Sequence, residues 1–416
     1  MTVNAVSLMS ATLATNAFGL VFWAVAARLD GPRAVGSAFA EVAALILLST
    51  LAQLNLSQVF IRFLPGAGRL TRPFIVRGYL VVTALALVVG SAFVLSGLGT
   101  SVVRASLPDR VLFVVSVALF AIFALQDSVL IGLRIAHWVP VENISFAAAK
   151  LALLPLLVFL GARTGIVVAW VLPIAAAVAI VNTLLFRGAV GRTRRLIGGY
   201  LPVRRRLASF VAAEYSADLC ITATVQLMPL LVLWRLGAVD EAYFTLPWLI
   251  RMGILVLFWN VNSSFVVEVL TPGAYTPHVL RRGLQLWGAI VAGAVLVCCL
   301  GAPLLLGLEG SEYAEHSATL LRLIGLSVPF TAVTVLYGVF AWLERRLWRL
   351  VAIQAATGLL MAALSLLLMP RLGVTAVGWA NLAAQAIAAA LMAPSLYARL
   401  VGRSSKTVPV VAEGLR

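Results

Sequence analysis

Long apolar segments divide the sequence, and this division restricts the chain to very few folds. Twelve stretches of about twenty residues or more are dominated by apolar side chains and are separated by short polar turns. In a bilayer the backbone must satisfy its own hydrogen bonds, so such stretches form transmembrane helices. Outer-membrane barrel strands are shorter and alternate in polarity. The expected spans are Ala5–Leu29, Gly36–Phe60, Phe74–Gly97, Val111–Leu133, Val139–Leu160, Gly165–Phe186, Leu207–Leu233, Tyr243–Leu270, Gly283–Gly307, Ala318–Trp342, Leu350–Met369 and Val374–Tyr397.

Composition agrees with an all-α polytopic membrane protein. Of the 416 residues, 62% are hydrophobic and only 11% are charged, against about 25% charged in soluble domains. The formal net charge of +16 would suit nucleic-acid binding in a soluble protein. Here the basic residues lie in short loops between apolar segments, where they set the orientation in the membrane. We therefore expect no nucleic-acid partner.

A basic segment at 187–206 separates six expected spans from another six. It contains seven arginines and no acidic residue. The loops on its side of the membrane carry most of the basic loop residues, which predicts that this side and both termini are cytoplasmic. The expected organisation is a six-helix bundle at 1–186, a cytoplasmic linker at 187–206, a second bundle at 207–397 and a cytoplasmic tail at 398–416.

The two halves also resemble each other in sequence. Gly161–Trp170 and Arg371–Trp379 are both short turns with Arg and Gly that lead into a small-residue helix start with Trp. Because each half has an even number of spans, both halves have the same orientation. They are expected to be parallel repeats related by an axis along the membrane normal.

No motif for soluble chemistry is present. The sequence lacks a phosphate-binding loop that ends in Lys-Ser or Lys-Thr, and its three histidines and three cysteines have no metal-ligand spacing. We therefore predict no catalytic residue, metal or cofactor, and a protein that is not an enzyme. No connection is long enough to fold as a domain, and no Asp-x-Asp motif occurs, which argues against a membrane glycan polymerase or glycosyltransferase.

Charged residues inside the expected spans are costly and usually functional. Lys150, Asp218 and Arg251 lie deepest, and Glu214 is one turn from Asp218. Cations there can hold an anionic headgroup such as a phosphate, whereas a carboxylate can bind a proton or metal ion and couple it to transport. We expect Asp218, Glu214 and Asp127 to be the ion-coupling candidates. The alternative is that these groups form structural ion pairs and interhelical hydrogen bonds.

The first two expected spans resemble a known family. The residues that carry the resemblance are Asn16-Ala17-Phe18-Gly19 through Ala26-Ala27-Arg28-Leu29, then Val35-Gly36, Leu51-Ala52-Gln53-Leu54-Asn55-Leu56 and Phe60-Ile61-Arg62-Phe63-Leu64-Pro65. They are similar to the polysaccharide-biosynthesis flippases of the multidrug/oligosaccharidyl-lipid/polysaccharide exporter superfamily, particularly its bacterial members. Twelve spans in equal halves with small loops extend the likeness over nearly the whole chain.

The resemblance implies two six-helix bundles in a V around a central cavity. It implies a flippase in the bacterial plasma membrane that moves polyprenyl-pyrophosphate-linked oligosaccharide from the inner to the outer leaflet by alternating access, for cell-surface polysaccharide synthesis. Implied partners are the lipid-linked glycan, membrane lipids and glycan-assembly proteins. Arg251 is the best match to a pyrophosphate-binding cation, with Lys150 as a second contact. The other implied substrate-binding residues are Arg28, Arg322 and Asn16.

One other transport class and two non-transport classes remain open. An ion-coupled exporter of small cationic compounds would place carboxylates in its cavity. A glycan polymerase would extend a glycan chain, against the motif evidence above. A non-transporting scaffold would tolerate replacement of Lys150, Asp218 and Arg251.

Overall fold

The expectation of an all-α membrane protein is confirmed. A computed structural model describes residues 2–161, 164–188, 190, 204–270, 277–307, 310–343 and 347–402. Within these ranges the chain forms helices and turns, and eleven helices are long and apolar enough to cross a membrane. The first helix adds a shorter apolar stretch at Thr15–Leu29, so the observed number of spans agrees with the expected twelve.

The helices follow the order of the expected spans. The first half contains α1 (Thr2–Leu29), α2 (Pro32–Gln53), α3 (Leu56–Phe63), α4 (Thr71–Leu95), α5 (Gly97–Val102), α6 (Leu107–Gly132), α7 (Trp138–Phe159) and α8 (Gly165–Arg187), with short 3₁₀ turns at Leu64–Gly66 and Gly68–Leu70. The second half contains α10 (Arg204–Leu236), α11 (Ala238–Leu270), α12 (Pro277–Leu300), α13 (Ala302–Leu306), α14 (Ser311–Leu343), α15 (Leu347–Leu372) and α16 (Thr375–Gly402).

Two expected spans are interrupted. The stretch predicted as one helix over Gly36–Phe60 is split because Leu54 and Asn55 both adopt left-handed backbone angles, with φ of 47° and 55°. Asparagine tolerates this region better than most residues. The stretch Gly283–Gly307 is split after Leu300, and Pro303, which has no backbone N–H to continue the ladder, lies at the start of α13.

Most of the expected linker at 187–206 lies outside the described residues, apart from the end of α8, residues 188 and 190 and the first turn of α10. The expected tail at 398–416 begins within α16, which continues to Gly402, and its remainder also lies outside the described residues.

The two halves repeat the same packing. Helix α4 packs on α6 as α12 packs on α14, and α7 packs on α8 as α15 packs on α16. In the same way, α1 packs on α7 as α10 packs on α15, and α2 packs on α6 as α11 packs on α14. Each matching pair has the same place in the order of six spans within its half. The fold is therefore that of two parallel repeats, as the sequence echo predicted.

The halves meet through their first two spans. Helix α2 packs against both α10 and α11, and α1 packs against α11. A hydrogen bond of 2.9 Å from the Tyr215 hydroxyl to the Leu51 carbonyl oxygen joins α10 to α2. Gly36 lets α2 and α11 approach, because an added Cβ would overlap the backbone carbonyl oxygen of Ala238.

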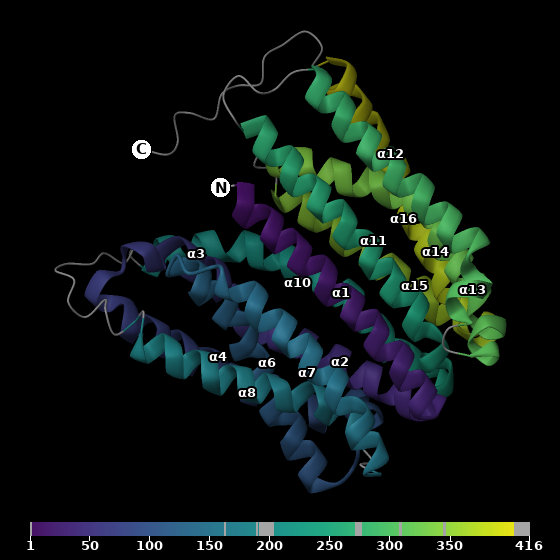
Figure 1. Ribbon diagram of the computed structural model, residues 1–416. Helices are drawn as coiled ribbons and strands as arrows, with labels where there is room; N and C mark the ends of the chain where they lie inside the picture. Colours follow the sequence, from purple (N-terminus) through teal and green to yellow (C-terminus); the bar gives the residue numbers. More distant parts are fainter. Residues whose placement is uncertain are drawn as a thin grey trace.

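Figure 1 shows the V that the family resemblance implies. The two groups of helices lie together near the end of α1 and diverge toward the side where α1 begins. One apolar core crosses between them, since Phe22 and Trp23 of α1 belong to the same buried cluster as Phe244 and Trp248 of α11. In lipid such contacts stabilise by close packing rather than by removal of apolar surface from water.

Candidate functional site

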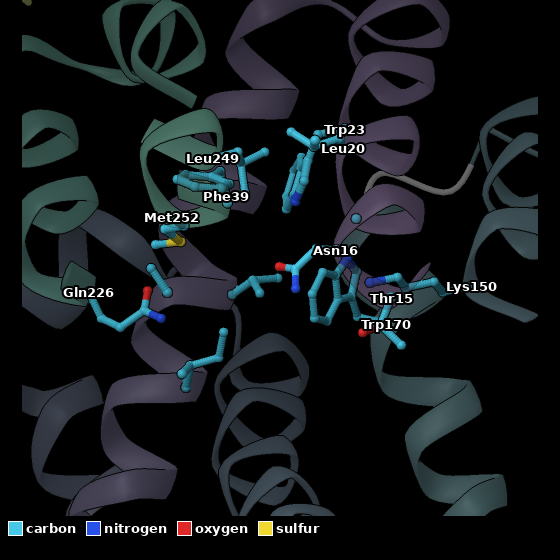
Figure 2. A pocket seen from close by; sticks show the side chains of 15 residues that line it. Thr15, Asn16, Leu20, Trp23, Phe39, Lys150, Trp170, Gln226, Leu249 and Met252 are labelled. Carbon is cyan, nitrogen blue, oxygen red and sulfur yellow. The ribbon is translucent and has the colours of Figure 1, made fainter. Parts of the chain in front are cut away.

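A cavity of about 190 Å³ lies between the two halves. Figure 2 shows Asn16, Lys150 and Trp170 on one side of it and Gln226 and Met252 on the other. Its described lining comes from α1, α2, α7 and α8 of the first half and from α10 and α11 of the second. We call it the central cavity. A site enclosed by both halves changes shape whenever the halves move relative to each other.

Lys150 is held on the wall of the central cavity by aromatic rings. Its side chain is only 4% exposed, and its Nζ lies 3.6 Å from the ring centroid of Trp170, 4.9 Å from Phe146 and 5.4 Å from Phe22. Cation–π attraction of this kind contributes about 2 kcal/mol or more when desolvated. Among the described residues Lys150 has no carboxylate partner within ion-pair distance, so its charge remains available to an anion.

The central cavity also supplies neutral hydrogen-bond donors. The indole Nε1 of Trp170 is buried with no hydrogen-bond partner. The amides of Asn16 and Gln226 line the same space, and each amide has two donor N–H groups. A lone cation together with such donors matches a ligand with many acceptor oxygens, such as a phosphate.

Arg251 belongs to a different cavity. A space of about 250 Å³ lies inside the second half, among α10, α11, α14, α15 and α16, and Arg251 lines it. We call it the second cavity. The guanidinium carbon lies 4.5 Å from the ring centroid of Trp248, whose own Nε1 donates to the Val225 carbonyl oxygen at 3.1 Å. Arg251 is 7% exposed, and its Nη1 is buried with no partner.

The two cations that the family resemblance assigned to one pyrophosphate are therefore not brought together. Lys150 lines the central cavity and Arg251 lines the second cavity. Met252, the residue after Arg251, lines both. Because neighbouring residues on a helix point about 100° apart, Arg251 faces the second cavity while Met252 lies between the two spaces.

The other candidate substrate-binding residues are spread over the molecule. Asn16 lines the central cavity. Arg28, in the last turn of α1, and Arg322, on α14, are exposed and line neither described cavity. The structure thus joins Asn16 to Lys150 and leaves Arg28 and Arg322 apart from both.

Two of the three candidate coupling residues, Asp218 and Asp127, line neither described cavity. Asp218 on α10 is exposed and lines neither, and the side chain of Glu214 lies outside the described residues. Asp127 on α6 accepts hydrogen bonds from Asn143 Nδ2 at 3.3 and 3.1 Å. The buried Glu142 lies within electrostatic range of Asp127, and neither of its carboxylate oxygens has a hydrogen-bond partner.

Sequence reasoning missed the uncharged parts of both cavities. Phe146 precedes Lys150 by one helical turn, so the spacing of four residues was an available signal for one ring of the cage. The other rings come from α1 and α8, which no local spacing connects to α7. Threonines on the second-cavity wall carry no charge, and nothing in their sequence positions distinguished them from other helix threonines.

Comparison with known proteins supports the fold. No protein-family model matches the sequence, and no curated protein matches it. Solved structures match over nearly the whole chain. A multidrug resistance MATE family transporter of the MOP (multidrug/oligosaccharidyl-lipid/polysaccharide) superfamily, in an inward-facing conformation, has a TM-score of 0.66 at 14% identity, covering 97% of this chain and 100% of that chain.

Two further structures widen the comparison. The lipid II flippase MurJ in an inward closed conformation has a TM-score of 0.67 at 10% identity, with 97% of this chain and 94% of that chain covered. A MOP superfamily transporter from Pyrococcus furiosus Vc1 (DSM3638), for which the reverse polarity of the binding pocket suggests a different function, has a TM-score of 0.55 at 13% identity, with 97% and 96% covered. The chain is a multi-pass membrane protein with the fold of MOP superfamily transporters, as its sequence led us to expect.

Proposed function

We propose that this protein is a non-enzymatic flippase that moves an anionic, polyprenyl-(pyro)phosphate-linked oligosaccharide across a bacterial plasma membrane by alternating access, for cell-surface polysaccharide synthesis. The phosphate-bearing part binds in the central cavity at Lys150, with Asn16 and Trp170 as further donors. The lipid tail remains among the membrane lipids, and glycan-assembly proteins supply and use the substrate.

One observation carries this proposal: each cavity has a single buried cation and no carboxylate among its described lining residues. A cavity that binds cationic drugs needs the opposite polarity. Buried, unpaired cations are costly unless an anion compensates them, so a negatively charged substrate is the simplest reason for keeping them.

The arrangement of the halves suits loading from the cytoplasmic leaflet. If the basic loops face the cytoplasm, then α1 begins on the cytoplasmic side. The V opens on that side (Figure 1) and is closed where α2 meets α11. This is the conformation in which a lipid-linked substrate assembled in the inner leaflet would enter.

Reconstitution tests the proposal directly. Purified protein in liposomes should speed the exposure of a fluorescent polyprenyl-pyrophosphate oligosaccharide to an external lectin or quencher, relative to protein-free liposomes. Replacement of Lys150 by Ala should abolish most of this gain, whereas Arg371→Gln, at an exposed position on the end of α15, should not. Equal exposure with and without protein would refute the proposal.

A second candidate is an exporter of small aromatic compounds. The rings around Lys150 favour it, because aromatic walls also bind flat organic molecules, and multidrug transporters share the fold. Overexpression should then raise resistance to several unrelated compounds. The cationic drugs expected of an ion-coupled exporter are disfavoured because Lys150 would repel them.

A further inference from the structure

The second cavity has a wall of hydroxyl oxygens whose protons are already used. Each of four lining threonines donates its hydroxyl hydrogen to a carbonyl oxygen of its own helix. These bonds run from Thr224 to Cys220 at 2.8 Å, from Thr331 to Ser327 at 3.1 Å, from Thr334 to Thr331 at 2.9 Å and from Thr357 to Ile353 at 2.8 Å. What these hydroxyls can still offer a ligand is therefore acceptor lone pairs.

The donors of this cavity are few and placed beside those acceptors. Arg251 brings a guanidinium whose Nη1 is buried without a partner. Gln385 also lines the space, and its Oε1 accepts a hydrogen bond of 3.2 Å from the Thr334 hydroxyl, whose one hydrogen is shared with the Thr331 carbonyl oxygen. This leaves the Nε2 amide group of Gln385 as a donor. The cavity thus combines one cation, at least one neutral donor and several acceptors.

This combination of donors and acceptors favours a sugar over a phosphate or an acyl chain as the ligand of the second cavity. An ionised phosphate has acceptors only, and it would face threonine oxygens that are acceptors too. An acyl chain would leave Arg251 and the amide without partners, which costs about 1–3 kcal/mol for each buried polar group. A sugar hydroxyl both donates and accepts, so it can bond to the threonine oxygens and to the Gln385 amide. An acidic substituent on that sugar would compensate Arg251.

Two further features fit a sugar. Trp259 lines the same cavity, and an indole offers an apolar face on which a pyranose ring can lie. Gly358 on α15 lies so close to the Thr224 hydroxyl that an added Cβ would overlap it. The wall is therefore closely packed at this point, which keeps the threonine in place.

We propose that the second cavity binds an acidic monosaccharide unit, such as a uronic acid, with its hydroxyl groups on the threonine wall and its carboxylate on Arg251. This inference rests on the proposed function, because the unit would be part of the transported glycan. The phosphate part then binds at Lys150, and Met252 lies between the two parts.

Binding of soluble sugars tests this separately from transport. The full chain in lipid nanodiscs is titrated calorimetrically with methyl β-D-glucuronide, methyl β-D-glucoside and inorganic pyrophosphate. We expect the glucuronide to bind about tenfold more tightly than the glucoside, as for a charge-assisted hydrogen bond. Arg251→Gln should reduce glucuronide affinity to the level of the glucoside, and Arg251→Lys should restore part of the difference.

A double variant tests the threonine wall separately from Arg251. The nearly isosteric pair Thr331→Val with Thr357→Val should weaken both sugars about tenfold without changing their ratio, and Arg371→Gln should change neither. Equal affinity for both sugars, or glucuronide affinity that is insensitive to Arg251→Gln, would overturn the proposal. Stronger binding of pyrophosphate than of glucuronide, lost in Arg251→Gln, would also overturn it.

The sugar-site proposal and the proposed function can fail separately, and the experiments distinguish the two outcomes. If the protein flips a lipid-linked glycan normally but does not bind the glucuronide selectively, only the proposed sugar site in the second cavity is refuted. Selective sugar binding without any flipping removes the flippase and leaves a sugar-binding site in a protein of this fold.

Discussion

The central cavity and the second cavity share Met252 but offer different hydrogen-bonding chemistry. In the central cavity, Lys150 and the indole of Trp170 are donors. In the second cavity, four threonine oxygens are acceptors around one guanidinium. A phosphate suits the first arrangement and a hydroxyl-rich acid suits the second. The proposed substrate has two chemically distinct parts that match this difference.

The repeat makes this contrast more informative. The packing of the halves is matched pair by pair, yet Lys150 lies on the fifth span of its half and Arg251 on the second span of its own. The two cations are therefore not equivalent positions of the repeat. The packing of the two halves is matched, whereas the polar side chains that line the two cavities differ.

The largest effect is expected from Lys150→Ala. It removes the single cation of the described central-cavity lining, and a lost charge-assisted contact of about 1.5–3 kcal/mol corresponds to a loss of roughly ten- to hundredfold in flipping rate. Lys150→Arg should retain a larger share of activity. The liposome assay measures both. Near-normal flipping by the alanine variant would show that the central cavity is not the phosphate site.

The second-largest effect is expected at the contact between α2 and α11 that closes the V. Gly36→Ala places a methyl group against the Ala238 carbonyl oxygen, and overpacking of this kind costs about 1–3 kcal/mol. We expect the halves to separate where α2 and α11 begin, and flipping to fall about tenfold. Spin labels at Arg33 and Val239, both exposed, would report the separation.

Gly31→Ala is the matched control for this substitution, since an added Cβ there meets nothing within 4 Å. It should leave the label distance unchanged. An unchanged distance in Gly36→Ala as well would contradict the role given to this contact in closing the V.

Arg251→Gln should separate the two cavities in a transport assay. We expect about a tenfold loss for a lipid-linked glycan with a uronic acid and little change for a neutral glycan. If the cavities act independently, combining this change with Lys150→Ala should multiply the two losses. Equal losses of transport rate for acidic and neutral glycans would show that the second cavity is not a separate site for the acidic unit.

A smaller effect is expected from Trp170→Leu. It removes the ring nearest the Lys150 ammonium, at 3.6 Å from its centroid, but leaves the rings of Phe146 and Phe22 in place. Only part of the cation–π attraction is then lost, and we expect affinity for the anion to fall about fivefold. Titration with inorganic pyrophosphate would measure it. The control is Trp379→Leu, an exposed tryptophan at the matching point of the sequence repeat. If both substitutions act alike, the ring has no special role.

The smallest effect on binding is expected from Asp127→Asn. Asp127 lines neither described cavity, so affinity for pyrophosphate and for glucuronide should change about twofold or less. If Asp127 couples an ion to transport, as the sequence suggested, the variant should lose its response to an imposed proton or sodium gradient. A gradient response that equals that of the unmodified protein would remove Asp127 from the coupling residues.

The sequence was sufficient for the fold because the fold follows from the bilayer. Runs of apolar residues with polar turns determine the helices, and the even division at 187–206 indicated two similar halves. The break at Leu54 and Asn55 was not predictable in the same way, since a left-handed leucine is set by tertiary packing and carries no sequence signal.

The site was only partly predictable, for a geometric reason. Counting residues from a helix end gives the depth of Lys150 and Arg251 in the membrane, and both are buried as expected. It does not say which neighbouring helices face them, so the division into two cavities was not foreseen. Carboxylates drew attention to Asp218, which is exposed, while the hydroxyl wall went unnoticed because threonine is an ordinary residue in membrane helices.

Met252 has a consequence for how the substrate range of such a protein could evolve. A methionine is unbranched and flexible, and it tolerates exchange for other residues at little cost. A smaller residue at this position would merge the two spaces and admit a bulkier unit beside the phosphate, while a larger one would shorten the reach of the glycan. Under the proposed function, substitution of this one residue would change the range of glycans that the protein accepts and leave the packing of the two halves intact.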